Sequence, residues 1–390
     1  MRDVAIIGIG QVPVGEHWAT SLRELGSRAV RRATADANVS SIDALYVGNM
    51  LAGSVSGQRH LGPLIAQYAG YSGVECLRIE SACGSGGAVV HAATRAVASG
   101  MADVVVAVGV EKMTDRSPTE VTAELATAAD ADFEADVGLS FVALNALLMQ
   151  RYLFECEARH EEFAPFVINA HANARGNPNA MFRFPVTAKS FAEAKMIADP
   201  INLLDSSPVS DGAAAVVLCP LESAHRYSRS PVRVLAAASA TDTLALHDRE
   251  DPLAFAAAGR SARRAYEQAG VGPEDISVLE VHDAFTITTV LSLEASGFAK
   301  RGEALRLATP DQIGIGGRLP LCTMGGLKAR GHAVGASGTY QIVELVQQLR
   351  GEAGPNQIAN PRIGMAQSIG GSAASVFTTI LGGPDHMPRR

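Results

Sequence analysis

The chain has 390 residues, of which 47% are hydrophobic and 19% are charged, and its formal net charge is −7. This is the composition of a globular protein, and the absence of any block of five basic residues argues against a nucleic acid or an anionic membrane as a partner. The five cysteines are odd in number and their spacing fits neither a disulfide framework nor a zinc site, which favours a reducing, cytoplasmic location.

Short apolar runs alternate with longer Ala-rich stretches, a pattern that predicts an α/β fold in which helices cover a sheet. The opening MRDVAIIGIG is predicted to be a strand and not a signal peptide, and no apolar run is long enough to predict a membrane span. The expected strands are Val4–Ile9, Ala44–Val47, Glu75–Ile79, Val104–Val110, Ala214–Leu218, Val232–Ala237, Ile276–Val281, Arg362–Ala366 and Ser375–Leu381. The expected helices are Leu22–Ala37, Leu61–Ala69, Gly84–Ala98, Ser140–Ala158, Leu253–Ala269, Phe285–Ser296 and Ala336–Leu349.

This alternation occurs twice, which predicts two related halves. The N-terminal half is expected to comprise residues 1–111 and 212–222, and the C-terminal half residues 231–390. Residues 112–211 are more polar and interrupt the rhythm. We interpret them as an insertion that covers a site between the halves; the alternative is a surface excursion without a role.

The first motif that can carry chemistry is SACGSGG, residues 81–87, which follows a strand and opens a helix. Cys83 at this helix N-terminus is expected to have a lowered pKa, because the helix dipole favours a thiolate. Its small neighbours leave room for a substrate carbonyl, and its backbone amide can donate to an oxyanion. The alternative is a small cysteine packed in the core.

Two histidines in the second half are candidates for proton transfer. His282 lies at the carboxyl end of a predicted strand, where ligands bind in α/β sheets. The alternative for this motif is a helix cap made by Asp283. His332 is the one titratable group in the middle of the Gly-rich run 325–338 that is suited to act as base for a thiol, although a histidine in such a loop can also be structural.

A fourth motif, SIGGSAA, spans residues 368–374 and is a Gly-rich turn between the last two predicted strands. Backbone amides at Gly370 and Gly371 could contact a substrate oxyanion. A plain hairpin turn is the alternative.

Taken together, SACGSGG, VHDAFT, GGLKARGHAVGASG and SIGG resemble the thiolase superfamily in order and spacing, in particular its sterol-carrier-protein-type members and their archaeal and bacterial relatives. The resemblance covers nearly the whole chain. It implies a five-layered αβαβα fold, an active site where the halves meet, an insertion that helps to bind coenzyme A, and a dimer formed through the N-terminal halves. It also implies that Cys83 carries the acyl group, that His332 activates the thiol, that His282 lies beside the oxyanion, and that the Gly370 amide joins that of Cys83 in an oxyanion hole.

The chain departs from the family pattern at its second acid/base. The family carries a second catalytic cysteine in a Cys-x-Gly element, where this chain has Ser368, or within His-Asp-Cys-Phe, where it has Ala284. Ser368 has too high a pKa to be a simple replacement. Cys322 lies shortly before the Gly-rich run and is a candidate, with a packing role as its alternative.

Three functions remain open at this stage. The first is an acetyl-CoA acetyltransferase-like acyltransferase that forms or cleaves 3-ketoacyl-CoA, using coenzyme A thioesters as substrates and no tightly bound cofactor or metal. The second is a thiolase-like retro-aldolase or ketone-forming acetyltransferase working with a small zinc-ribbon and OB-fold partner. The third is a non-catalytic subunit that binds CoA thioesters. A homodimer or tetramer is expected, and the residues that bind the CoA phosphates are not assigned.

Overall fold

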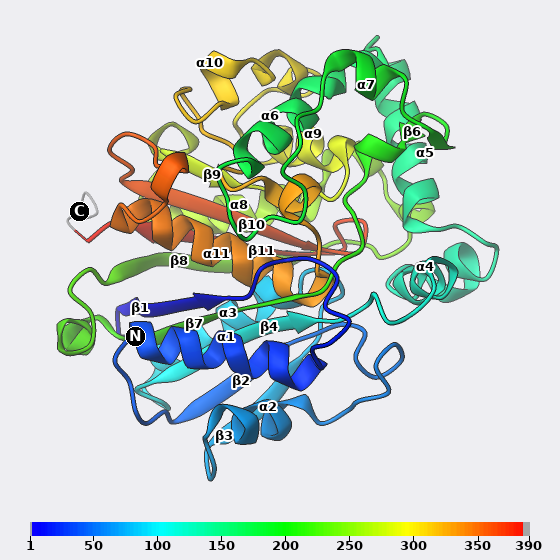
Figure 1. Cartoon of the computed structure of the whole chain (residues 1–390). Helices are drawn as coiled ribbons and strands as arrows, with labels where there is room; N and C mark the ends of the chain where they lie inside the picture. Colours follow the sequence, from blue (N-terminus) through cyan, green and yellow to red (C-terminus); the bar gives the residue numbers. More distant parts are fainter. Residues whose placement is uncertain (1, 385–390) are drawn as a thin grey trace.

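The protein is described here by a computed structural model that covers residues 2–384 (Figure 1). Its main sheet has nine strands in the order β3-β2-β4-β7-β1-β8-β11-β10-β9. The strands are β1 Val4–Gln11, β2 Ala44–Gly48, β3 Glu75–Ile79, β4 Val105–Glu111, β7 Gly212–Pro220, β8 Val232–Thr241, β9 Val278–Glu280, β10 Ile363–Gly370 and β11 Ser375–Gly382, with β5 Met196–Ala198 and β6 Ile201–Asn202 as a separate pair. The helices are α1 Leu22–Asp36, α2 Leu61–Ala69, α3 Ser85–Ser99, α4 Pro118–Ala126, α5 Phe141–Glu155, α6 Ala164–Ala174, α7 Ala188–Ala192, α8 Ala256–Ala269, α9 Thr286–Ala295, α10 Pro310–Ile313 and α11 Val334–Arg350.

The long sheet is composed of two parts, one from each half of the chain. β1 pairs with β8 only through Val4–Ile6 and Val232–Val234, whereas β11 pairs with β8 along the whole length of β11. Beyond this short seam the two parts diverge, and α11 lies between the strands of the two halves (Figure 1).

Alternation along the strands produces the layers. In β7, Ala214 and Val216 face a core that also contains residues of α3 and α11, whereas Ala215 and Val217 face the residues of α1 and α2. Successive strand side chains point to opposite faces of the sheet, so a strand with small apolar residues throughout is buried on both faces. On the other side, Ala236 of β8 belongs to a third core with α8 and α9. The predicted αβαβα arrangement is confirmed.

Glycines in the motifs allow the two central helices to touch. A methyl group added to Gly338 of α11 would lie 2.3 Å from the Gly87 nitrogen of α3 and 2.5 Å from Ser368 Oγ. A methyl group on Gly86 would lie 2.8 Å from the nitrogens of both Gly338 and Thr339. Real side chains do not approach backbone so closely, so these positions require glycine.

Residues 112–211 contain α4 to α7 and the pair β5–β6. Asp211 joins both ends of this segment: its carboxylate accepts hydrogen bonds from the Met113 and Thr114 amides at 2.7 and 3.0 Å and pairs with Lys112 at 3.3 Å. The division of the chain at 111/112 and 211/212 stays a prediction. Residues 385–390 of the predicted C-terminal half lie outside the described residues.

The predicted elements correspond to observed ones, with differences at their ends. The helix predicted from Leu253 begins at Ala256, because Pro252–Ala254 form a separate 3-10 turn and Phe255 has φ +43°. A left-handed residue cannot continue a right-handed helix. Within residues 2–384, no helix combines the length and apolar character needed to cross a bilayer.

We expect Gly338→Ala to lower the free energy of unfolding by about 1–3 kcal/mol or more, since the added methyl group overpacks the contact between α3 and α11. Thermal or urea unfolding followed by circular dichroism measures this. Gly316→Ala is the matched control, because a methyl group there would meet no atom within 4 Å. Equal stability of both variants and the parent protein would contradict this account of the helix contact.

Candidate active site

Cys83 lies in a tight turn between β3 and α3. The turn is closed by hydrogen bonds from the Gly84 amide to Ser81 O at 2.9 Å and from the Ser85 amide to Ala82 O at 3.1 Å, and Ala82 has φ +50°. The Ser81 hydroxyl lies 2.7 Å from the Ser375 hydroxyl of β11, which fixes the turn to the second half. This fold of the chain places the thiol at the interface between the halves.

The thiol does not have the lowered pKa that its place at a helix N-terminus predicted. Burial, with a smaller contribution from the Glu111 carboxylate, raises the pKa of Cys83 to about 12. The prediction was wrong because desolvation of a thiolate in this apolar site outweighs the dipole of α3. The resting protein therefore holds Cys83 as a neutral thiol.

His332 lies one residue before the N-cap of α11, and its ring is oriented by that helix. Its Nδ1 lies 2.8 Å from the Ser337 hydroxyl, which in turn donates to Ala333 O at 3.2 Å. Because the Ser337 hydroxyl gives its one hydrogen to Ala333 O, it can only accept a hydrogen bond from the His332 ring. Nδ1 of His332 therefore carries the proton, and Nε2 has a free lone pair. Burial, together with His282 and Arg330, holds the pKa of His332 well below its ordinary value, so the ring is neutral and can accept a proton.

His282 follows β9 and meets His332 edge to face, with ring centroids 5.1 Å apart and an interplanar angle of 86°. Burial lowers its pKa to about 3, and the positive charge of Arg330 contributes. Its Nδ1 is buried without a hydrogen-bond partner. Asp283 does not cap α9: its carboxylate accepts from the Leu327 amide at 2.7 Å and so joins the two histidine motifs.

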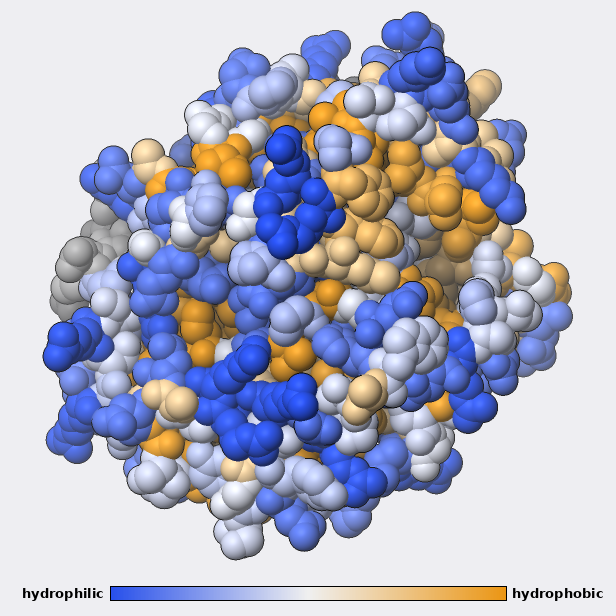
Figure 2. All heavy atoms as spheres, viewed as in Figure 1, coloured by the Kyte–Doolittle hydropathy of each residue, from blue (hydrophilic) through white to orange (hydrophobic). Residues whose placement is uncertain are grey.

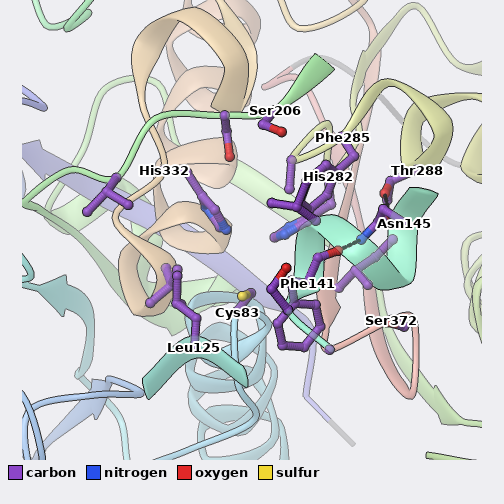
Figure 3. Close-up of a pocket in the computed structure, with 18 of the residues that line it drawn as sticks. Cys83, Leu125, Phe141, Asn145, Ser206, His282, Phe285, Thr288, His332 and Ser372 are labelled. Atoms are coloured by element: carbon purple, nitrogen blue, oxygen red, sulfur yellow. Dashed lines mark hydrogen bonds between the residues drawn. The ribbon is translucent and has the colours of Figure 1, made fainter. Parts of the chain in front are cut away.

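The structure brings these three predicted residues together. The sulfur of Cys83 and one ring nitrogen from each of His282 and His332 lie within 4.8 Å of one another. Both imidazoles point toward the space above the sulfur (Figure 3). In the part of the chain that the structure describes, they are also the one group of such side chains close enough to hold a metal ion. The expectation of no metal stays a prediction.

A cavity of about 160 Å³ lies over these residues. The first half, the insertion and the second half all contribute to its walls, which are mostly apolar (Figure 3). They include Leu125, Phe141, Val142, Asn145, Ser206, Val209, Phe255, Ala284, Phe285, Thr288, Ile369, Gly371, Ser372 and Ala373. Residues of the segment predicted to cover the site thus form part of its wall.

The other predicted residues lie at different distances from the cavity. Gly371 lines it. Gly370 lies against the Cys83 turn, since a methyl group on Gly84 would be 2.9 Å from the Gly370 nitrogen. The cavity lining includes neither Cys322, which contacts Val281 O at 3.8 Å, nor Ser368, which packs against Gly87 and Gly338.

Two contributors to the site were not identified from the sequence. Ser337 orients His332, and its position in the same Gly-rich run was the available signal. Glu111 is fully buried and accepts hydrogen bonds from the amides of Met50 at 2.9 Å and Gly335 at 3.1 Å. A carboxylate at the carboxyl end of an otherwise wholly apolar strand was the signal for it.

We predict that alkylation of Cys83 by iodoacetamide accelerates with pH through about pH 10, because thiolate is the reactive form and a free cysteine titrates near pH 8.5. Peptide mass spectrometry after timed labelling resolves Cys83 from the other cysteines. A rate that is constant above about pH 7 would show a thiolate already formed.

The chain matches two family models, described as "Thiolase, N-terminal domain" over residues 4–222 and "Thiolase C-terminal domain-like" over residues 238–383. It is 44% identical to the acetyl-CoA acetyltransferase of Methanothermobacter thermautotrophicus, over 98% of this chain and 100% of that one. It is 40% identical to the acetyl-CoA acetyltransferase of Methanocaldococcus jannaschii, over 98% and 99% of the two chains.

Solved structures show the same fold. The Ltp2-ChsH2(DUF35) aldolase superposes with a TM-score of 0.85 at 26% identity, covering 99% of each chain. Human mitochondrial 3-ketoacyl-CoA thiolase superposes with a TM-score of 0.76 at 18% identity, covering 98% of this chain and 99% of that one. The resemblance noted from the motifs is confirmed, and this chain belongs to the thiolase family.

Proposed function

We propose that this thiolase-type acyl-CoA C-acyltransferase forms or cleaves 3-ketoacyl-CoA through a thioester on Cys83. The class of enzyme follows from the family and from relatives 40–44% identical over the whole chain. The observation that carries the role of Cys83 is its convergence with His282 and His332, within 4.8 Å, in a cavity.

The first half-reaction starts from neutral partners. His332 Nε2 takes the thiol proton as Cys83 Sγ attacks the thioester carbonyl carbon, and the imidazolium then returns the proton to the departing CoA sulfur. The oxyanion is held by the Cys83 and Gly370 amides. Support comes from the Gly370 amide beside the Cys83 turn and from the fixed Nδ1 of His332.

The second half-reaction needs a base that removes a proton from the α-carbon of the incoming acyl-CoA. Since the cavity lining includes neither Cys322 nor Ser368, we assign the proton transfers to His282 and His332. Burial keeps both rings neutral and ready to accept a proton.

The cavity supports a short acyl group. Its volume of about 160 Å³ is close to the roughly 150 Å³ that accommodates one benzene molecule in an apolar protein cavity. Acetyl and acetoacetyl thioesters are therefore the substrates to try first. A homodimer or tetramer, a cytoplasmic location and a small partner protein stay predictions.

Incubation with acetyl-CoA should add one acetyl group to Cys83, detected by peptide mass spectrometry. His332→Asn should slow the acetylation by about 10²-fold or more, because general base catalysis is worth about 10²–10⁴-fold. His225→Asn, at an exposed position outside the cavity, should acetylate at the parent rate. An unlabelled Cys83 would refute its role as nucleophile.

A second candidate is an aldolase or a ketone-forming acetyltransferase that acts with a partner, as the superposition on the Ltp2-ChsH2(DUF35) aldolase suggests. Acetoacetyl-CoA with free CoA distinguishes the two. We expect release of acetyl-CoA by the chain alone, and its loss in Cys83→Ala. If the parent chain alone does not cleave acetoacetyl-CoA, the partner-dependent activity is favoured. If the Cys83→Ala variant supports the metabolic pathway in the cell as well as the parent chain does, a non-catalytic subunit is favoured.

A further inference from the structure

We infer that Asp205 is a positioning residue that sets the spacing of the two active-site histidines. This inference rests on the proposed function, in which His282 and His332 act on the same substrate. Asp205 is fully buried, and it directly precedes residues 206–209, which we call the bridging segment. Ser206, Ser207, Pro208 and Val209 of this segment all line the cavity.

The bridging segment spans the distance between the two histidine motifs. At one end, Ser207 donates its amide hydrogen to Ala284 O at 2.8 Å, two residues after His282. At the other end, Val209 pairs with His332 itself in a parallel β-bridge. The backbone of one short segment thus contacts both motifs, so a shift of the segment changes the position of one ring relative to the other.

Asp205 fixes the start of this segment from several directions. Its Oδ2 accepts from the Asn202 amide at 2.9 Å and lies 2.6 Å from His160 Nε2 in the insertion. Its Oδ1 accepts a hydrogen bond from the Thr286 hydroxyl, and its backbone oxygen accepts a hydrogen bond from Lys328 Nζ.

Two of these donors belong to the histidine motifs. Thr286 opens α9 and lies four residues after His282, and Lys328 lies four residues before His332. The two donors therefore join Asp205 to both motifs, while His160 joins it to the insertion. None of Asp205, Thr286, Lys328 and His160 lines the cavity. A substitution at one of these residues therefore affects the reaction by moving the histidines and not by removing a contact with the substrate.

The Thr286 hydroxyl offers the sharpest test, because valine has nearly the same shape as threonine and cannot donate, whereas serine keeps the donor. We expect Thr286→Val to lower kcat about tenfold to a hundredfold, in line with the cost of displacing reacting groups by about 1 Å. The KM for acetoacetyl-CoA should stay within about twofold, since binding surfaces are unchanged. Thr286→Ser should retain most of the parent kcat.

Thermal unfolding of each variant separates positioning from loss of folded protein. A Thr286→Val variant that is fully folded with parent kcat overturns the inference, as does a fall in kcat that matches the unfolded fraction. Asp205→Asn provides a second variant, and Asp132→Asn on the exposed surface of the insertion is its control. We expect Asp205→Asn to lower kcat with little change in KM, and Asp132→Asn to keep the parent kcat.

A readout that does not need acyl transfer keeps the two proposals apart. If His332 assists ionisation of the thiol, Cys83 alkylation by iodoacetamide at neutral pH should slow several-fold in Thr286→Val and not in Thr286→Ser. Should the parent protein fail to take up acetyl from acetyl-CoA while this contrast is found, the proposed function fails and the positioning role stands. Equal alkylation rates in both variants and the parent overturn the positioning role.

Discussion

The close contact of α3 with α11 is the constraint on which the site depends. One reactive residue lies just before the N-cap of each helix: Cys83 before that of α3 and His332 before that of α11. Because Gly86, Gly87 and Gly338 carry no side chains, the helix backbones meet near these ends. The Cys83 thiol and the His332 imidazole, which are 249 positions apart in the chain, are thereby brought close together.

The second consequence of this packing is an uncharged catalytic pair. The reactive groups lie at the interface between the two halves, where the cost of desolvating a charge exceeds the benefit of the helix dipoles. Burial raises the pKa of Cys83 to about 12 and lowers that of His282 to about 3. Charge then develops only when substrate is present, which suits a reaction whose transition state carries a buried oxyanion and an imidazolium.

The fold and the members of the site could largely be predicted from the sequence, because they depend on local patterns. The alternating strands and helices predicted an α/β fold with two related halves, and the resemblance of the four motifs to the thiolase superfamily implied the five layers and the convergence of Cys83, His282 and His332. What could not be predicted depends on long-range packing. The raised pKa of Cys83 arises from burial by distant segments, and the placement of Cys322 outside the cavity depends on the path of the chain between β9 and the Gly-rich run. Asp283 looked like a local helix cap and instead bonds to an amide 44 positions away.

The most direct test of the account is an experimental structure of the protein after incubation with acetyl-CoA. The account predicts an acetyl group on Cys83 Sγ, with the thioester oxygen within hydrogen-bonding distance of the Cys83 and Gly370 amides and with both imidazoles facing it. An unmodified sulfur with the two rings directed away from it would contradict the account.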